Sequence, residues 1–206
     1  MENLFPERGT QIIRQRLRFT QIRTAAHPAT VLYAETVKGL RAEVTAAQEA
    51  VEEAEVQRLV AIAERRYEDG IANADTAEAV RVLLNDCKGD RNADDYKRVV
   101  PVAPSQGTRP TGGTAQGAYI RGIIANGRAL ANPSPAFLAT LDTLEATQGR
   151  MDAADAKVEA TERALGAARV ERDLLERRVC ADYNHLFFEI NQALPHQKAL
   201  VESMFG

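Results

Sequence analysis

Beginning at Phe137, apolar residues recur every seven positions along most of the C-terminal third of the chain. The repeat is broken by one charge, Arg172, and its apolar members are Phe137, Leu144, Met151, Val158, Leu165, Val179 and Leu186. Seven-residue spacing keeps these side chains on one side of a long helix, which is stable only when another helix lies alongside. With aromatic residues at only 5% and no Trp, the composition also favours long paired helices over a thick globular core.

A second long helix is predicted nearer the N-terminus, where a heptad stripe is followed by a second stripe in a shifted phase. The first stripe is Val37, Leu40, Val44, Ala47, Val51 and Ala54, and the shifted stripe is Val56, Leu59, Ala63 and Tyr67. A phase slip changes the supercoil locally without ending the helix. We therefore expect both stripes to face the core.

The two predicted helices have nearly equal lengths, about 60 residues or roughly 90 Å each. One follows His27-Pro28, and the other opens at Pro133-Ser134-Pro135, where Ser can cap the helix and Pro fits its first turn. The expected fold is mainly α: an antiparallel coiled-coil hairpin or elongated helical bundle that pairs Ala29 with Ala193. Breaks at Gly70 and Gly149 would instead fold the helices back into a shorter four-helix bundle.

The predicted helices divide the chain into five segments. These are an Arg-rich arm (1–28), the first helical region (29–87), a Gly/Pro-rich connector (88–132), the second helical region (133–194) and a short amphipathic segment (195–206). Within the connector, residues 96–102 and 119–124 are rich in Val, Ile and Tyr and predict a small β element. A period-two pattern also occurs near the N-terminus, where Arg14, Arg16, Arg18 and Thr20 alternate with Ile13, Gln15, Leu17 and Phe19. Strand and helix therefore both remain open over residues 11–22, as they do over 96–124.

The N-terminal arm is the one strongly basic segment of a chain whose formal net charge is only −3. Its candidate contacts with a polyanion are Arg14, Arg16, Arg18 and Arg23. Arginines interleaved with apolar side chains suit phosphate groups or an acidic protein surface. The acidic stretch of a neighbouring copy, from Glu49 to Glu55, is an equally good partner.

The heptad and the amphipathic C-terminal segment supply the candidate protein-interaction residues. They are Leu144, Met151, Val158, Leu165, Val179, Leu186, Leu200, Val201, Met204 and Phe205. A thin two-helix seam buries little surface, so we expect helices from other copies or other subunits to complete the core. The C-terminal apolar face needs a partner either in the same chain or in another subunit.

Metal and catalytic motifs are weak in this sequence. Asp182, His185 and Glu189 share a helix face, but no second Glu-x-x-His completes a carboxylate-bridged metal site. Asp90, Asn92 and Asp94 match the first three ligand positions of a calcium loop, yet Asp95 stands where the turn requires Gly and Pro101 where it requires Glu. An Asp/Asn-rich turn is the simpler interpretation, with calcium as the alternative.

Nucleotide and nucleophile motifs are also incomplete. The run from Gly107 to Gly117 lacks the Gly-Lys-Ser/Thr ending of a phosphate-binding loop. Cys87 and Cys180 show no CxxC spacing, and the hairpin would hold them far apart, so we expect free thiols. We therefore predict no cofactor, no metal and no enzymatic activity.

These observations favour a structural or adaptor subunit that assembles through helical contacts into a larger protein particle, such as a virion or a secretion machine. The alternative is a nucleic-acid- or polyanion-associated protein anchored by residues 8–23. The first residues lack the basic segment and apolar run of a secretory signal, and no run of eighteen apolar residues occurs. We therefore expect no membrane partner, and a location in the cytoplasm or within a large non-exported assembly.

Overall fold

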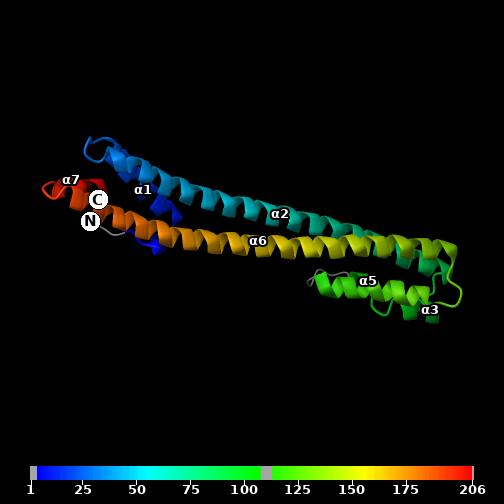
Figure 1. The fold of residues 1–206 in the computed structure, drawn as a ribbon. Helices are drawn as coiled ribbons and strands as arrows, with labels where there is room; N and C mark the ends of the chain where they lie inside the picture. Colours follow the sequence, from blue (N-terminus) through cyan, green and yellow to red (C-terminus); the bar gives the residue numbers. More distant parts are fainter. Residues whose placement is uncertain (1–3, 108–112, 206) are drawn as a thin grey trace. The chain divides into compact units, whose positions relative to one another are not determined.

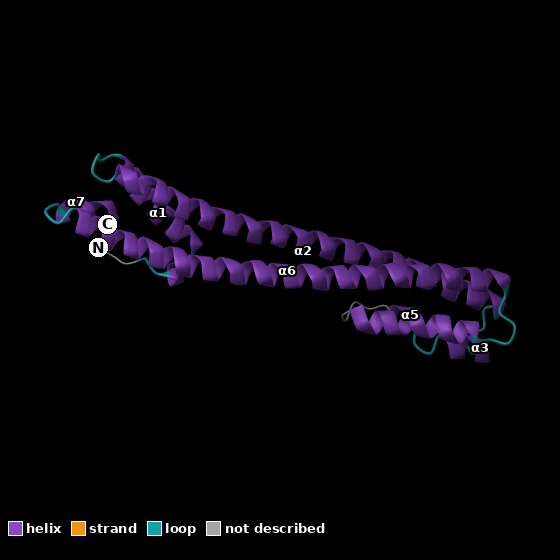
Figure 2. Cartoon of the chain, in the orientation of Figure 1, coloured by secondary structure: helices purple, strands orange, loops and turns teal. Residues whose placement is uncertain are grey.

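The chain is mainly α-helical, and its two longest helices pack against each other as a helical hairpin. The computed structural model describes residues 4–107 and 113–205. Their elements are η1 (Pro6–Arg8), α1 (Thr10–Ala25), α2 (Val31–Asp86), α3 (Asp94–Val99), α4 (Pro104–Gly107), α5 (Gly113–Arg128), α6 (Pro135–Ala193) and α7 (Lys198–Phe205). Within these residues no strand occurs (Figure 2).

Two compact units make up the chain, and α2 and α6 each contribute to both. Unit 1 comprises Met1–Gln57 and Glu162–Gly206, and unit 2 comprises Arg58–Thr161. In each unit α2 and α6 lie side by side (Figure 1). The predicted antiparallel register holds: in unit 1 Arg178 pairs with Glu43, and in unit 2 Thr147 donates a hydrogen bond to Asp75.

Local sequence explains where the long helices begin and end. The last turn of α2 closes at Lys88 and Gly89, both with positive φ, and the Gly89 N–H donates to the Leu84 carbonyl at 2.8 Å. Such a left-handed pair is a common helix stop. At the start of α6 the Ser134 hydroxyl accepts the Phe137 N–H at 3.1 Å, as the predicted cap requires. Both helices run through Gly70 and Gly149, so the four-helix alternative is not formed.

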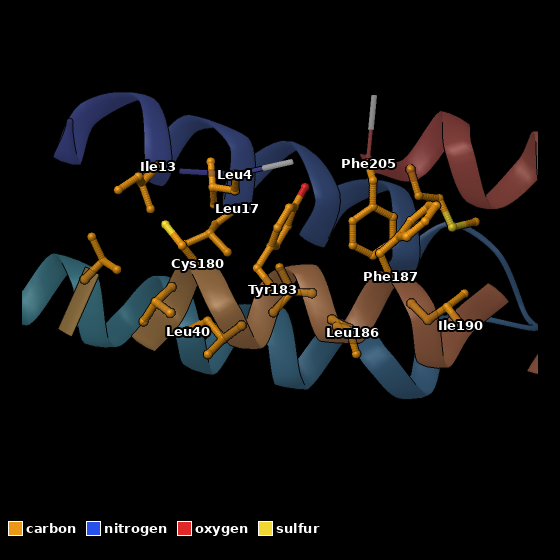
Figure 3. Close-up of a cluster of buried hydrophobic side chains, with 14 of the residues drawn as sticks. Leu4, Ile13, Leu17, Leu40, Cys180, Tyr183, Leu186, Phe187, Ile190 and Phe205 are labelled. Atoms are coloured by element: carbon orange, nitrogen blue, oxygen red, sulfur yellow. The ribbon is translucent and has the colours of Figure 1, made fainter. Parts of the chain in front are cut away.

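The core of unit 1 lies where α1 and α7 pack against α2 and α6. Tyr183 and Phe187 of α6 contact Phe205 of α7, with ring centroids 5.1 and 5.3 Å apart (Figure 3). Ile13 and Leu17 of α1 are fully buried in the same cluster. Residues 10–25 form a helix, in which Ile13 and Leu17, four positions apart, both face this core. A strand would bury Phe19 on the same side as Ile13 and Leu17, but Phe19 is 37% exposed.

The core of unit 2 forms where α3 and α5 pack beside α2 and α6. Val99 of α3 and Ile120 and Ile123 of α5 are buried there with Phe137 and Leu144 of α6. The predicted β element over 96–102 and 119–124 is therefore wrong. These apolar residues form helices because their buried members recur at helical spacing against the hairpin, and tertiary contacts override β propensity.

Candidate functional site

The apolar residues predicted to contact other proteins lie mostly inside the chain. Leu144, Met151, Leu165, Val179 and Leu186 are buried along α6. In α7 the residues Val201, Met204 and Phe205 are buried in the unit 1 core, and Leu200 packs against it. Val158 is half-buried. The partner of the amphipathic C-terminal segment is thus found within the same chain.

The shifted stripe of α2 was predicted to face the core, and that prediction is wrong. Val56, Leu59 and Tyr67 are 51%, 54% and 69% exposed. The core-facing side of α2 instead continues in the original phase, through fully buried Ala61 and Ala72. The sequence pattern was ambiguous because α2 has two apolar sides. The side that faces the core also includes charged residues at its repeating positions.

Arg65 is a charged residue on the core-facing side of α2, so this side looks less apolar in the sequence than the outer side does. It is 9% exposed and forms ion pairs with Asp69 on its own helix and with Asp155 of α6. Burial acts to lower the pKa of Arg65, but hydrogen bonds to the two carboxylates outweigh it and raise the pKa. A buried charge of this kind is retained only when it is paired. A pattern search for apolar residues cannot find it.

On the opposite side of α2, unit 2 carries an apolar stripe that the chain leaves exposed. We call it the outer stripe, and its residues are Leu59, Val60, Ala63, Tyr67, Gly70 and Ala74. Their spacing places all six within an arc of about 100° over roughly 22 Å of helix. The flanking charges lie outside this arc: Glu64 is paired with Lys157 of α6 at 2.5 Å, and Arg66 is exposed.

The outer stripe has large side chains at one end and small ones at the other, with Ala63 and Tyr67 between them. Leu59 and Val60 stand at one end, and Gly70 and Ala74 at the other. A Cβ added at Gly70 would meet nothing within 4 Å, so the chain itself leaves this space open. Small residues allow a second helix to approach closely, and larger side chains fill the space that they leave.

The four arginines predicted to bind a polyanion lie on two different sides of α1. Arg14 and Arg18 line a cleft of about 170 Å³ together with Gln11, Gln15 and Arg41 of α2. Arg16 instead donates to the Phe205 carbonyl at 3.2 Å, and Arg23 lies over the Phe19 ring, 5.3 Å from its centroid. Arg41 was missed in the sequence because it lies outside the N-terminal arm. We call Arg14, Arg18 and Arg41 with the two glutamines the arginine cleft.

The remaining chemical candidates make local contacts. The Asn92 N–H donates to the Asp90 carboxylate at 2.8 Å, which makes a local turn before α3. His185 pairs with Glu189 at 3.4 Å on an exposed side of α6. Across residues 4–107 and 113–205, no group of three His, Cys, Asp or Glu side chains is placed to hold a metal ion. The Gly107–Gly117 run falls partly outside the described residues.

Both cysteines are free thiols with weak nucleophilic character. Burial raises the pKa of Cys180 to about 11, with smaller contributions from Glu176 and Glu7. Burial also raises the pKa of Cys87, helped by Asp95. Because the thiolate is the reactive form, neither environment resembles that of a catalytic cysteine.

A pocket of about 560 Å³ in unit 2 lies between the end of α2 and the α3–α4 segment. Val80, Leu84, Tyr96 and Val100 give it an apolar wall, and Arg81 stands at its edge. Arg81 is exposed and is already held by Glu78. Arg91 and Ser105 add further polar groups to the lining of this pocket.

Comparisons with family models, with curated proteins and with solved structures gave no match for this chain. Among the described helices, none has a stretch long and apolar enough to cross a bilayer.

Proposed function

We propose that this protein is a non-enzymatic structural or adaptor subunit that associates through helix–helix contacts, with the outer stripe of α2 as its contact surface. The observation that carries the proposal is the uncharged arc from Leu59 to Ala74, in which Leu59, Val60 and Tyr67 are 54%, 44% and 69% exposed. Contiguous exposed apolar surface bordered by charges is typical of interaction sites. The same helix uses its other side for the hairpin.

A second copy of the chain is the partner that the stripe fits best. If two α2 helices meet antiparallel about a two-fold axis near residue 65, Val60 of each copy lies opposite Gly70 of the other. Ala63 likewise lies opposite Tyr67. Val60 and Tyr67 then each face a small side chain, which suits a self-complementary two-fold contact.

Such a contact is small, because one helix pair over about 22 Å falls short of the roughly 800 Å² per partner of standard interfaces. We therefore expect dimerisation that depends on protein concentration. A two-fold contact also closes on itself. Growth into a larger particle, such as a virion or a secretion machine, would require a second contact elsewhere.

The test is the solution mass of the full chain by size-exclusion chromatography with light scattering, at low and high salt and at several concentrations. We expect a mass that rises toward twice the 22.5 kDa chain mass and changes little with salt, because the stripe is uncharged. Gly70→Leu should return the chain to a monomer, because the new side chain would fill the space that Val60 of the partner needs.

Gly149→Leu on α6 is the matched control, because a Cβ at that position also meets nothing within 4 Å. Both variants should keep the helical signal of the parent in circular dichroism. A monomeric parent at all concentrations would refute self-association. A dimer that survives Gly70→Leu would show that another surface mediates it.

A further inference from the structure

The arginine cleft of unit 1 gathers positive charge that the chain does not neutralise. Arg14 and Arg18 stand one helical turn apart on α1, and Arg41 reaches the same cleft from α2. The other lining residues, Gln11 and Gln15, are uncharged, so among the described residues no carboxylate lines the cleft. Placing like charges together is unfavourable unless an anion lies between them.

Several arginines elsewhere in the hairpin have carboxylate partners. Arg169 and Arg178 of α6 pair with Glu55 and Glu43 of α2, and Arg65 pairs with Asp155. By contrast, within the described part of the chain Arg14 and Arg18 form no ion pair. Arg41 donates only to the neutral amide of Gln21, at 3.1 Å. The cleft therefore brings together three arginines for which the described residues supply no carboxylate partner.

We propose that the arginine cleft binds the phosphate backbone of a nucleic acid. Guanidinium groups bind phosphate oxygens through paired hydrogen bonds, and the glutamine amides can donate further ones. Two arginines on successive turns of α1 present donors along a line of about 6 Å, which suits a chain of phosphates better than a single ion.

Contacts with phosphates alone carry no sequence information. We therefore expect binding that is independent of sequence and steeply dependent on salt. Three arginines on a single strand predict a slope of about −2 for the logarithm of the association constant against the logarithm of salt concentration. The site lies entirely in unit 1 and does not depend on the outer stripe of unit 2.

The experiment is fluorescence anisotropy of a labelled oligothymidylate of about twenty nucleotides, titrated with the full chain at several salt concentrations. Arg14→Gln, Arg18→Gln and Arg41→Gln should each weaken binding about five- to tenfold at low salt and make the slope shallower by about 0.7. Arg23→Gln is the matched control, because it removes the same charge from the same helix outside the cleft. It should weaken binding less than twofold.

Several outcomes would overturn the assignment. One is an undetectable complex at low salt, and another is an equal loss from Arg23→Gln, which would mean that only the net charge of the arm matters. Inorganic phosphate that competes as well as the oligonucleotide, at constant ionic strength, would show a site for a lone phosphate. Binding to vesicles of phosphatidylcholine and phosphatidylserine without oligonucleotide binding would assign the cleft to a lipid surface.

Discussion

The core of unit 1 contains polar side chains and a thiol that are buried away from solvent. Thr20 of α1 joins the Tyr183 hydroxyl at 2.7 Å and donates to the Met204 carbonyl at 2.9 Å. Cys180 of α6 is 2% exposed in the same core. Because buried polar groups are costly unless satisfied, these residues specify how α1, α6 and α7 fit together.

The pH dependence of stability provides a test at this scale. The pKa of Cys180 is raised from 9.0 to about 11, so the folded state keeps a proton that the unfolded state loses. This contribution to stability is present below pH 9 and is lost as the pH rises toward 11. Between pH 8 and pH 10 we expect the parent to lose about 1 kcal/mol more of its free energy of unfolding than Cys180→Ala does.

Urea unfolding of the two proteins at each pH measures this difference. The alanine variant also loses packing, but that loss is the same at every pH and cancels in the comparison. Parallel curves of unfolding free energy against pH would mean that the Cys180 thiol titrates normally in the folded state.

At the scale of elements, α5 packs closely against α6 in unit 2. A Cβ at Gly127 would lie 2.8 Å from Leu141 Cδ1 and 3.0 Å from the Phe137 ring. Both neighbours are buried, with almost no room to move. Gly127 is therefore required by packing, whereas Gly149 on the same unit is open.

A pair of alanine substitutions separates these two roles. Gly149→Ala should stabilise the protein by up to about 1 kcal/mol, because alanine is the better helix former and meets no neighbour. Gly127→Ala should destabilise it by about 1 kcal/mol or more, because overpacking outweighs the helix preference. Chemical denaturation measures both. Equal stabilisation by the two changes would show that α5 does not pack closely on α6.

For the whole molecule, the two separate hydrophobic cores predict two regions of different stability. Leu17, Tyr183 and Phe205 belong to one core, and Ile120 and Leu144 to the other. Long helices connect them, but each core contributes its own burial free energy. A substitution that disrupts one core should therefore lower the stability of mainly its own unit.

Hydrogen exchange followed by mass spectrometry tests this expectation. Phe205→Ala removes a fully buried ring that packs on Tyr183 and Phe187, a change that typically costs about 3–5 kcal/mol. Amides of α1 and α7 should lose protection, and amides of α3 and α5 should keep theirs. A uniform loss across all four helices would instead mean that the chain unfolds as one cooperative unit.

The sequence by itself determined the two long helices, their boundaries and their antiparallel register. Those features depend on local signals, such as the Ser134 cap, and on a heptad that continues through Met151 and Leu165. Such signals act over a few residues or repeat regularly, so they can be read without knowing the partner helix.

Only the tertiary structure decided which apolar residues are buried and which charges meet. Arg65 occupies a core position because Asp69 and Asp155 reach it there, and this leaves Leu59 and Tyr67 exposed on the outer stripe. The helical state of α1, α3 and α5 and the meeting of Arg14 with Arg41 also depend on packing between distant segments. A periodic pattern shows which side of a helix has the most apolar residues. Which side is buried depends on the segments that pack against it, and the fold determines those contacts.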